Sequence, residues 1–381
     1  MPEDWQAGGF GLYIHWPFCA AKCPYCDFNS HVSRSIDHAA WRTAFVAEIE
    51  RVAVATKGRT LHSVFFGGGT PSLMEPATVD AILQTVHRAW PVANDLEVTL
   101  EANPTSVEAA KFSDFHVAGV NRVSMGIQAL IDTDLVALGR LHTVSEALTA
   151  FDIAREEFDR VSFDLMYGRQ NQSLTRWESE LMRALSLGVD HLSLYQLTIE
   201  EGTAFGDRYK SGKLSGLPNE DLSADMYNIT QDICNAFGMP RYEVSNHASD
   251  GHESRHNLIY WRYGDYAGIG PGAHGRLTLG GTKFAIEQTR MPAAWLGKLE
   301  KEHREALTNA DQGAEFLLMG LRLTQGVSLD RFNRLSGQKL NSTKVSQLQD
   351  MGMIKLDNGY ISVTNHGFHI LNAVLRELLS H

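Results

Sequence analysis

The sequence predicts an α/β fold: a partial (β/α)6 barrel of the TIM type, followed by a small C-terminal winged-helix-like α+β domain. The barrel is predicted by six alternations of an apolar, β-branched segment with an amphipathic segment in the first 240 residues. Such strands are typical of a parallel sheet covered by helices. The smaller domain is predicted by an Asn-Gly pair between two apolar runs near the C-terminus, which is a strong hairpin signal.

The barrel segments follow one another in the order that right-handed β-α-β connections require. We expect strands at 12–16, 62–66, 96–101, 122–127, 161–165 and 191–197, and helices at 37–56, 77–90, 106–118, 144–157, 173–187 and 220–238. The first helix places four large apolar residues on one face: Trp41, Phe45, Ile49 and Val52. Six units are fewer than the eight of a closed barrel, and in such folds the chemistry lies at the carboxyl ends of the strands.

The remaining chain divides into two parts. Residues 240–290 are rich in Gly, His and Tyr without a regular period, so we expect an irregular connection. Beyond it we expect helices at 311–323, 328–336 and 342–351, a hairpin of 353–356 with 360–363, and a last helix at 366–379. The expected domains are therefore 1–240, 241–300 and 301–381.

The composition excludes several classes of protein. Acidic residues outnumber basic ones, 45 to 34, for a net charge of −11. Such a surface repels phosphate backbones and anionic lipids, so we expect no nucleic-acid binding. No run approaches the 18 apolar residues of a membrane span, and the first residues lack the basic and apolar stretches of a targeting signal. We expect a cytoplasmic protein without direct membrane insertion.

Three of the four cysteines stand together as Cys19-Ala-Ala-Lys-Cys23-Pro-Tyr-Cys26, directly after the first expected strand. One loop with three thiolates can hold three corners of a [4Fe-4S] cubane. The fourth iron then stays open for the amine and carboxylate of a bound molecule.

Two other sites fit the same cysteines. Cys23-Pro-Tyr-Cys26 alone has the spacing of a thiol exchanger. A structural zinc would need a fourth ligand, which His15 or His31 could supply. Cys234 stands alone in an expected helix and is interpreted as a small buried apolar residue.

Several ordered motifs resemble the radical S-adenosylmethionine superfamily and, more narrowly, the family of the oxygen-independent coproporphyrinogen III oxidase. They are Tyr13-Ile-His-Trp-Pro-Phe-Cys19, Phe66-Gly-Gly-Gly-Thr70-Pro-Ser, Leu100-Glu101-Ala-Asn-Pro104, Ser124-Met-Gly-Ile-Gln128 and Asp164-Leu-Met-Tyr-Gly168. The resemblance runs from about residue 10 to the C-terminal domain. It implies a [4Fe-4S] cluster on Cys19, Cys23 and Cys26.

The resemblance also implies S-adenosylmethionine as a second cofactor. Its implied contacts are Tyr13, Tyr25, Gly68, Gly69, Thr70, Glu101, Gln128, Arg140 and Asp164. The glycines would let backbone groups approach the amino-acid end of the cofactor, and Glu101 would accept hydrogen bonds from its ammonium or ribose. The residues alone leave other interpretations open: a tight turn for the glycines, a structural ion pair of Asp164 with Arg140, and a strand cap for Gln128.

Two further features resemble the haem-chaperone branch of that family. Phe28 stands where the decarboxylating oxidase has another cysteine, and His256-Asn-Leu-Ile-Tyr260-Trp261 matches the H-N-x-x-Y-W motif of the branch. A neutral imidazole is a common axial ligand of haem iron, and Tyr260 and Trp261 could form a flat wall. His256 could equally be a structural histidine.

The resemblance implies a chaperone that binds haem and passes it to apo-haemoproteins, including membrane-bound respiratory enzymes, with a homodimer as a further expectation. The alternative is an oxidase that decarboxylates coproporphyrinogen III by a 5′-deoxyadenosyl radical. A DNA-binding regulator is disfavoured, because residues 310–381 carry seven basic and six acidic residues, too weak a basic footprint. One departure is Arg169-Gln170, where the family usually has Leu-Pro.

Overall fold

One large sheet organises the protein. The computed structural model describes residues 3–33, 35–298 and 301–380. Within these ranges eleven strands pair in the order β13-β12-β11-β10-β1-β4-β5-β6-β7-β8-β9. The central strands are β1 (Phe10–Trp16), β4 (Leu61–Gly68), β5 (Val92–Ala102), β6 (Arg122–Gln128), β7 (Arg160–Tyr167) and β8 (His191–Gln196). They pair in parallel with their neighbours, as predicted.

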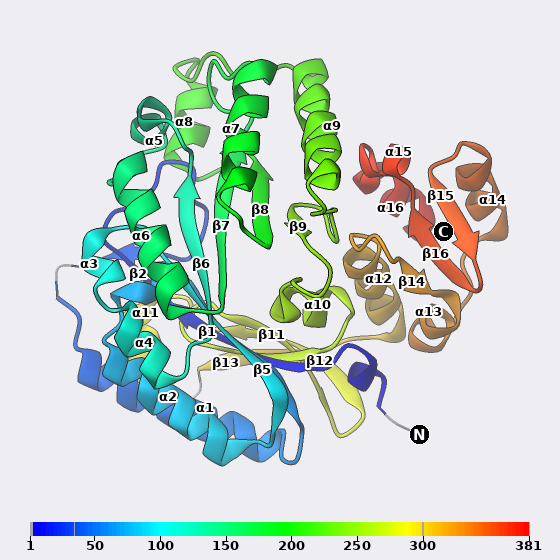
Figure 1. Ribbon diagram of the computed structural model, residues 1–381. Coiled ribbons are helices and arrows are strands. Elements are labelled where there is room, and N and C mark those ends of the chain that lie inside the picture. Colours follow the sequence, from blue (N-terminus) through cyan, green and yellow to red (C-terminus); the bar gives the residue numbers. More distant parts are fainter. Residues whose placement is uncertain (1–2, 34, 299–300, 381) are drawn as a thin grey trace.

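Helices follow each of these strands and lie along the outside of the curved sheet (Figure 1). They are α1 (His38–Ala55), α2 (Pro76–Ala89), α3 (Ser106–Ala109), α4 (Phe112–Ala118), α5 (Asp132–Ala137), α6 (Val144–Glu157), α7 (Leu174–Ser186), α8 (Ala204–Lys210) and α9 (Glu220–Ala236). The predicted partial barrel is confirmed. The helix expected over 106–118 is divided into α3 and α4, and α5 and α8 were not expected.

The first helix shows how the pattern positions an element. Asp37 accepts a hydrogen bond from the Ala40 N–H at the helix N-terminus. The four apolar residues of the predicted face are buried. Trp41 among them stacks on Trp295 of α11 (Pro292–Gly297) with ring centroids 5.6 Å apart. Helix α1 therefore packs both on the barrel and against α11, which follows the later strands of the sheet.

The expectation that residues 240–290 are irregular is wrong. They contain β9 (Asn246–Ala248), α10 (Arg255–Trp261), β10 (Asp265–Ile269), β11 (His274–Leu279) and β12 (Thr282–Gln288). The first residue of β10 pairs with Phe10 of β1 in parallel, and β11, β12 and β13 (Glu302–Ala306) extend the sheet as antiparallel strands. Buried Asp265 fixes this junction through Arg59 at 2.7 Å and Lys283 at 3.1 Å.

The C-terminal region builds its own apolar core around Phe316, Ile361 and Val374. Its elements are α12 (Asn309–Gly320), β14 (Val327–Ser328), α13 (Leu329–Ser336), α14 (Ser342–Asp350), β15 (Ile354–Asp357), β16 (Tyr360–Val363), α15 (Asn365–Phe368) and α16 (Leu371–Leu379). Asn358 and Gly359 have φ of 48° and 79°, the backbone of a tight hairpin turn. The predicted hairpin is therefore confirmed, and β14 adds a third strand.

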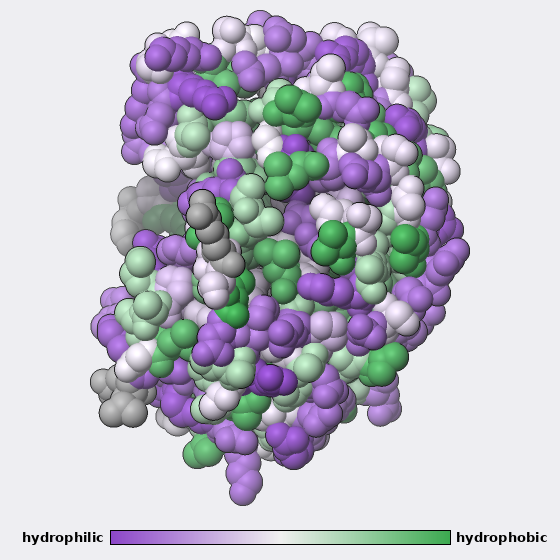
Figure 2. All heavy atoms as spheres, turned by 90° about the vertical axis from the view of Figure 1, so that its left-hand side faces the viewer, coloured by the Kyte–Doolittle hydropathy of each residue, from purple (hydrophilic) through white to green (hydrophobic). Residues whose placement is uncertain are grey.

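Ion pairs join the C-terminal region to the sheet. Arg276 of β11 and Glu315 of α12 are 2.7 Å apart, and Arg331 of α13 lies 2.8 Å from Asp4. Figure 1 shows this region beside α10 and the end of the sheet that carries β9. The opposite face, with the outer helices, is mostly hydrophilic with scattered apolar residues (Figure 2). Across the described ranges, no helix combines the length and apolarity needed to cross a membrane.

Candidate functional site

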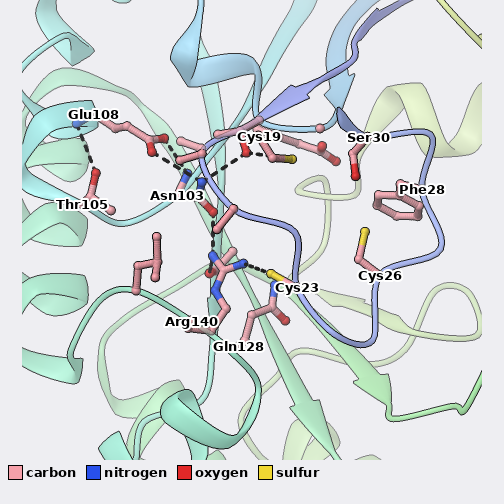
Figure 3. Close-up of a pocket in the computed structure, with 18 of the residues that line it drawn as sticks. Cys19, Cys23, Cys26, Phe28, Ser30, Asn103, Thr105, Glu108, Gln128 and Arg140 are labelled. Carbon is pink, nitrogen blue, oxygen red and sulfur yellow. Dashed lines mark hydrogen bonds between the residues drawn. The ribbon is translucent and has the colours of Figure 1, made fainter. Parts of the chain in front are cut away.

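The three clustered cysteines lie in one loop at the carboxyl end of β1. Two short parallel strands, β2 (Phe18–Cys19) and β3 (His31–Val32), hold the two ends of this loop together. All three thiols are free and half-buried. They line a cavity of about 180 Å³ together with Arg140 and Gln128 (Figure 3).

Hydrogen-bond donors approach two of these sulfurs. Arg140 Nη1 donates to Cys23 Sγ at 3.3 Å, and Thr70 Oγ1 donates to Cys19 Sγ at 3.5 Å. Burial raises the pKa of the Cys19 thiol, and the Thr70 hydrogen bond opposes that shift. Donors beside sulfur stabilise thiolates, so Cys19 and Cys23 are suited to act as thiolate ligands.

A cubane takes one thiolate at each of three irons, so its ligands need not converge on one point. In the described part of the chain, no three His, Cys, Asp or Glu side chains converge on a single ion. His15, one candidate for a zinc ligand, uses both ring nitrogens elsewhere: Nδ1 with the Tyr13 hydroxyl and Nε2 with the Asn29 carbonyl, each at 3.0 Å. The residues present fit the cubane better than a zinc ion.

The structure brings most of the residues implied for S-adenosylmethionine to the same cavity. Those lining it are Tyr25, Gly68, Gly69, Thr70, Glu101, Gln128, Arg140 and Asp164. Tyr13 lies instead on a larger neighbouring cavity. The individual roles of these residues stay predictions.

Two of the glycines are required by close contacts. Gly68 has φ of 108°, and a Cβ there would lie 2.6 Å from the ring of His15. A Cβ on Gly69 would lie 2.6 Å from the Phe18 carbonyl oxygen. Any side chain at these positions would displace the cysteine loop from β4. The absence of side chains at Gly68 and Gly69 therefore allows both the tight turn and the open cavity.

Two half-buried carboxyl groups, Glu101 and Asp164, line both cavities. Burial, together with the charge of Asp164, raises the pKa of Glu101 to about 8. Burial also raises the pKa of Asp164 to about 6. A cationic group that entered between them would reverse this cost, which suits the ammonium or sulfonium of S-adenosylmethionine.

Arg140 does not form the structural ion pair with Asp164 that the sequence left open. Its Nη2 donates to Asn103 Oδ1 at 2.6 Å and to the Gly126 carbonyl at 2.8 Å (Figure 3). Asn103 Nδ2 in turn donates to Thr70 Oγ1 at 3.2 Å. Asn103 therefore links the two donors that face the thiols. Sequence reasoning gave it no role, although it lies within one of the matched motifs.

The departure at Arg169 has a structural explanation. Buried Arg169 pairs with Glu180, and with Asp134 at 3.0 Å, and its Nη1 donates to the Gln128 carbonyl at 3.4 Å. Glu180 Oε1 also accepts from the Leu130 N–H at 2.6 Å. This network supports Gln128, whose φ of 73° is uncommon outside glycine. The residue is more than a strand cap, because its backbone turns the chain at the cavity edge.

A larger cavity of about 690 Å³ lies beside the first one. Its aromatic lining includes Tyr13, Phe65, His256, Tyr260, Trp261 and Tyr266. Barrel strands, the region around α10 and Arg322 of the C-terminal region all contribute to its walls. The two cavities share Phe28, Gly68, Glu101, Ser124 and Asp164, so they are contiguous.

His256 is held rigidly in the wall of the larger cavity. Its Nδ1 is 2.9 Å from Ser63 Oγ, and its ring stacks on Phe65 with centroids 5.0 Å apart. The Glu97 carboxylate accepts from its backbone N–H at 3.2 Å. Burial lowers the pKa of His256 to about 4, so the imidazole is neutral at neutral pH.

Asn29 connects the cysteine loop to this larger cavity. It follows Cys26 by three residues, and its Nδ2 donates to the carbonyls of Pro271 and Arg290, each at 2.9 Å. Arg290 itself lines the larger cavity. The loop is thereby fastened to the β10–β11 turn and to the segment after β12.

The chain is similar to known proteins over nearly its whole length. The family model described as Radical SAM superfamily matches residues 13–179, and the HemN C-terminal domain matches 307–370. Radical S-adenosyl methionine domain-containing protein 1, mitochondrial, of Bos taurus is 39% identical, over 97% of this chain and 87% of that protein. The protein named heme chaperone HemW of Escherichia coli (strain K12) is 36% identical, over 97% of this chain and 98% of its own.

A solved structure shares the fold. Coproporphyrinogen III oxidase (HemN) from Escherichia coli superposes with a TM-score of 0.80 at 20% identity, covering 99% of this chain and 92% of the other. The likeness to curated relatives extends over nearly the whole length of both chains, and both domains match. The chain belongs to the radical S-adenosylmethionine superfamily and, within it, to the family of the curated haem chaperones named HemW.

Proposed function

We propose that this protein is a haem chaperone that holds a [4Fe-4S] cluster on Cys19, Cys23 and Cys26, S-adenosylmethionine in the smaller cavity and haem in the larger one. It would transfer that haem to apo-haemoproteins. The observation that carries the proposal is the aromatic cavity of about 690 Å³, with His256 in its wall, contiguous with the three-cysteine cavity. The relatives named heme chaperone HemW support the same function.

The larger cavity has the chemistry that a porphyrin needs. Its volume lies within the ordinary range for cofactor-sized ligands, and its aromatic walls offer flat apolar surface. The rings of Tyr260 and Trp261 are adjacent, with centroids 4.7 Å apart. These two residues continue the wall that Phe65 and His256 begin.

His256 suits an axial ligand. Ser63 engages Nδ1, which leaves Nε2 as the ring nitrogen for iron, and a partner on the other nitrogen fixes the tautomer of a metal-binding histidine. Because burial keeps the imidazole neutral, iron would not compete with a proton at neutral pH. An iron held by one histidine would be compatible with a cargo that must later be released.

The cluster and S-adenosylmethionine, when bound, supply one-electron chemistry at the neighbouring cavity. The chain's own residues would bind and orient these groups: Arg140 and Thr70 donate toward sulfur, and the glycines of β4 allow close approach. Glu101 would accept hydrogen bonds from the cofactor. Phe28, at the boundary of the two cavities, adds no thiol to the cysteine set.

The test is an anaerobic reconstitution with iron and sulfide, followed by addition of haem and then of an apo-haemoprotein such as apomyoglobin. We expect a cluster absorption band, a shifted Soret band, and transfer of haem to the acceptor. A parallel assay offers coproporphyrinogen III with S-adenosylmethionine. Decarboxylated product would overturn the chaperone in favour of the oxidase.

The partners belong to the same proposal. We propose apo-haemoproteins, including membrane-bound respiratory enzymes, as acceptors, a cytoplasmic site of action, and a homodimer. Crosslinking of the haem-loaded protein in cell extract, with identification of the captured haemoproteins, tests the acceptors. Light scattering of the reconstituted protein tests the dimer.

A further inference from the structure

We infer that the C-terminal region supplies a carboxylate-binding residue, Arg322, to the larger cavity, and that its guanidinium binds a propionate of the porphyrin. This inference rests on the proposed function and goes beyond it. It gives the C-terminal region a direct part in holding the cargo.

Three arginines line the larger cavity, and two of them have partners. Arg122 is buried, and its donors reach Ser162 Oγ at 2.8 Å, Thr99 Oγ1 at 3.4 Å and His191 Nδ1 at 3.4 Å. Arg290 pairs with Glu287 at 3.2 Å. The donors of Arg122 are therefore engaged within the chain, and Arg290 belongs to an ion pair in which its side chain is 69% exposed.

Arg322 is different. It follows the C-terminus of α12 and lies over the Trp261 ring, with its Cζ 5.7 Å from the ring centroid. Its one side-chain hydrogen bond within the described ranges goes to the Leu318 carbonyl of α12. None of the ion pairs within those ranges includes Arg322.

The surroundings of Arg322 make this arrangement costly. The residue is half-buried, and burial lowers the pKa of its guanidinium. Glu243 lines the same cavity and its charge favours protonated Arg322, but the Glu243 carboxylate accepts from Asn246 Nδ2 and from the Ser245 N–H at 3.3 Å. A partly desolvated cation without an ion-pair partner is strongly stabilised when an anion binds beside it.

A propionate is the anion that fits. Arginine binds carboxylates through two parallel hydrogen bonds, and haem carries two propionates on one edge of an otherwise apolar ring. Trp261 belongs to α10, the helix that also carries His256. The proposed iron ligand would thus come from α10 and the carboxylate site from Arg322, which lies over Trp261 of the same helix. Together they would fix the orientation of the porphyrin ring in the cavity.

The experiment titrates ferric haem and its dimethyl ester, in which both carboxylates are blocked, into the full-length protein and follows the Soret band. Wild type should prefer haem to the ester by about tenfold to a hundredfold, the range of a charge-assisted hydrogen bond. R322Q should lose most of that preference, because its affinity for haem should fall while its affinity for the ester stays the same. R322K, which keeps the charge without the planar fork, should fall between them.

Arg262 is the matched control, because it is exposed, lies one residue after Trp261 and donates to Gln325. R262Q should keep the wild-type preference. An R322Q protein that still discriminates haem from the ester overturns the inference, as does a wild type that binds both equally; in either case haem binding itself stands. If the wild-type protein binds neither haem nor the ester, the proposed function is overturned as well.

Discussion

The ring of Tyr13 stacks on the imidazole of His256, with ring centroids 6.2 Å apart and planes inclined by 28°. The Tyr13 hydroxyl contacts His15, which in turn contacts Asn29, three residues after Cys26. Side chains in direct contact thus join the cysteine loop to the histidine proposed for haem. Two sites that are 230 positions apart in sequence share one wall.

Replacing Cys23 by alanine should abolish the cluster. The variant lacks one of three thiolates, so anaerobic reconstitution should leave little iron, little sulfide and no brown colour. The control is Cys234→Ala, since Cys234 is fully buried in α9 and away from the loop. Normal iron and sulfide in Cys23→Ala would remove the cluster assignment.

Replacing His256 by alanine should weaken haem binding by about tenfold or more, which is roughly 1.4 kcal/mol, and leave the cluster intact. The loss of the iron ligand is specific, so both haem and its dimethyl ester should be weakened alike. His252→Ala is the control, because the side chain of that histidine is 44% exposed and pairs with Asp190. Unchanged Soret titrations in His256→Ala would place the ligand on another residue.

The stability of the cofactor-free protein should fall at alkaline pH because of Glu101. Its pKa is raised from 4.5 to about 8 on folding, so the folded state binds the proton more tightly than the unfolded one. The associated stability is complete below pH 4.5 and is lost as the pH rises through about 8. Urea unfolding at about pH 6 and pH 9 should show a loss of roughly 2–3 kcal/mol in wild type.

Glu101→Gln should remove most of that difference, because the amide stays neutral at both pH values. Glu50→Gln, at an exposed position of α1, should leave the difference as it is in wild type. If Glu101→Gln and wild type lose the same stability between the two pH values, another group is responsible.

Arg169→Leu should destabilise the protein by about 3–5 kcal/mol, because it leaves the Glu180 carboxylate buried without its partner. Arg176→Leu is the matched control: it pairs with Asp134 at 3.4 Å, but its side chain is 42% exposed, so it should cost less than about 1 kcal/mol. Chemical unfolding measures both. The double variant Arg169→Leu/Glu180→Gln should regain part of the lost stability. If it regains none, the charge on Glu180 is not the cause of the loss.

Local patterns were enough to predict much of this fold. The four-residue apolar period of α1 and the Asn358-Gly359 turn each encode their structure within a few residues. The cysteine spacing and the glycines of β4 likewise placed the smaller cavity. Such features depend on neighbours in sequence, which is why the sequence reveals them.

The rest depends on contacts between distant segments. The five residues of β10 include a glycine and a buried aspartate, and their partner strand β1 lies some 250 residues earlier, so no local period could reveal the pairing. Arg322 likewise joins the larger cavity only because the C-terminal region packs beside α10. The sequence also could not show that Tyr13 faces the larger cavity, since a strand residue can point to either face.

The hydrogen bonds of Asn29 determine when, during synthesis of the chain, the cysteine loop can be fixed in place. The carbonyls that it binds come 242 and 261 residues later, so a ribosome has made most of the protein before the loop can be fastened. A loop fixed in this way loses less conformational entropy when it takes up iron and sulfide. The cysteine loop therefore reaches its final position only once the chain has been made at least as far as Arg290.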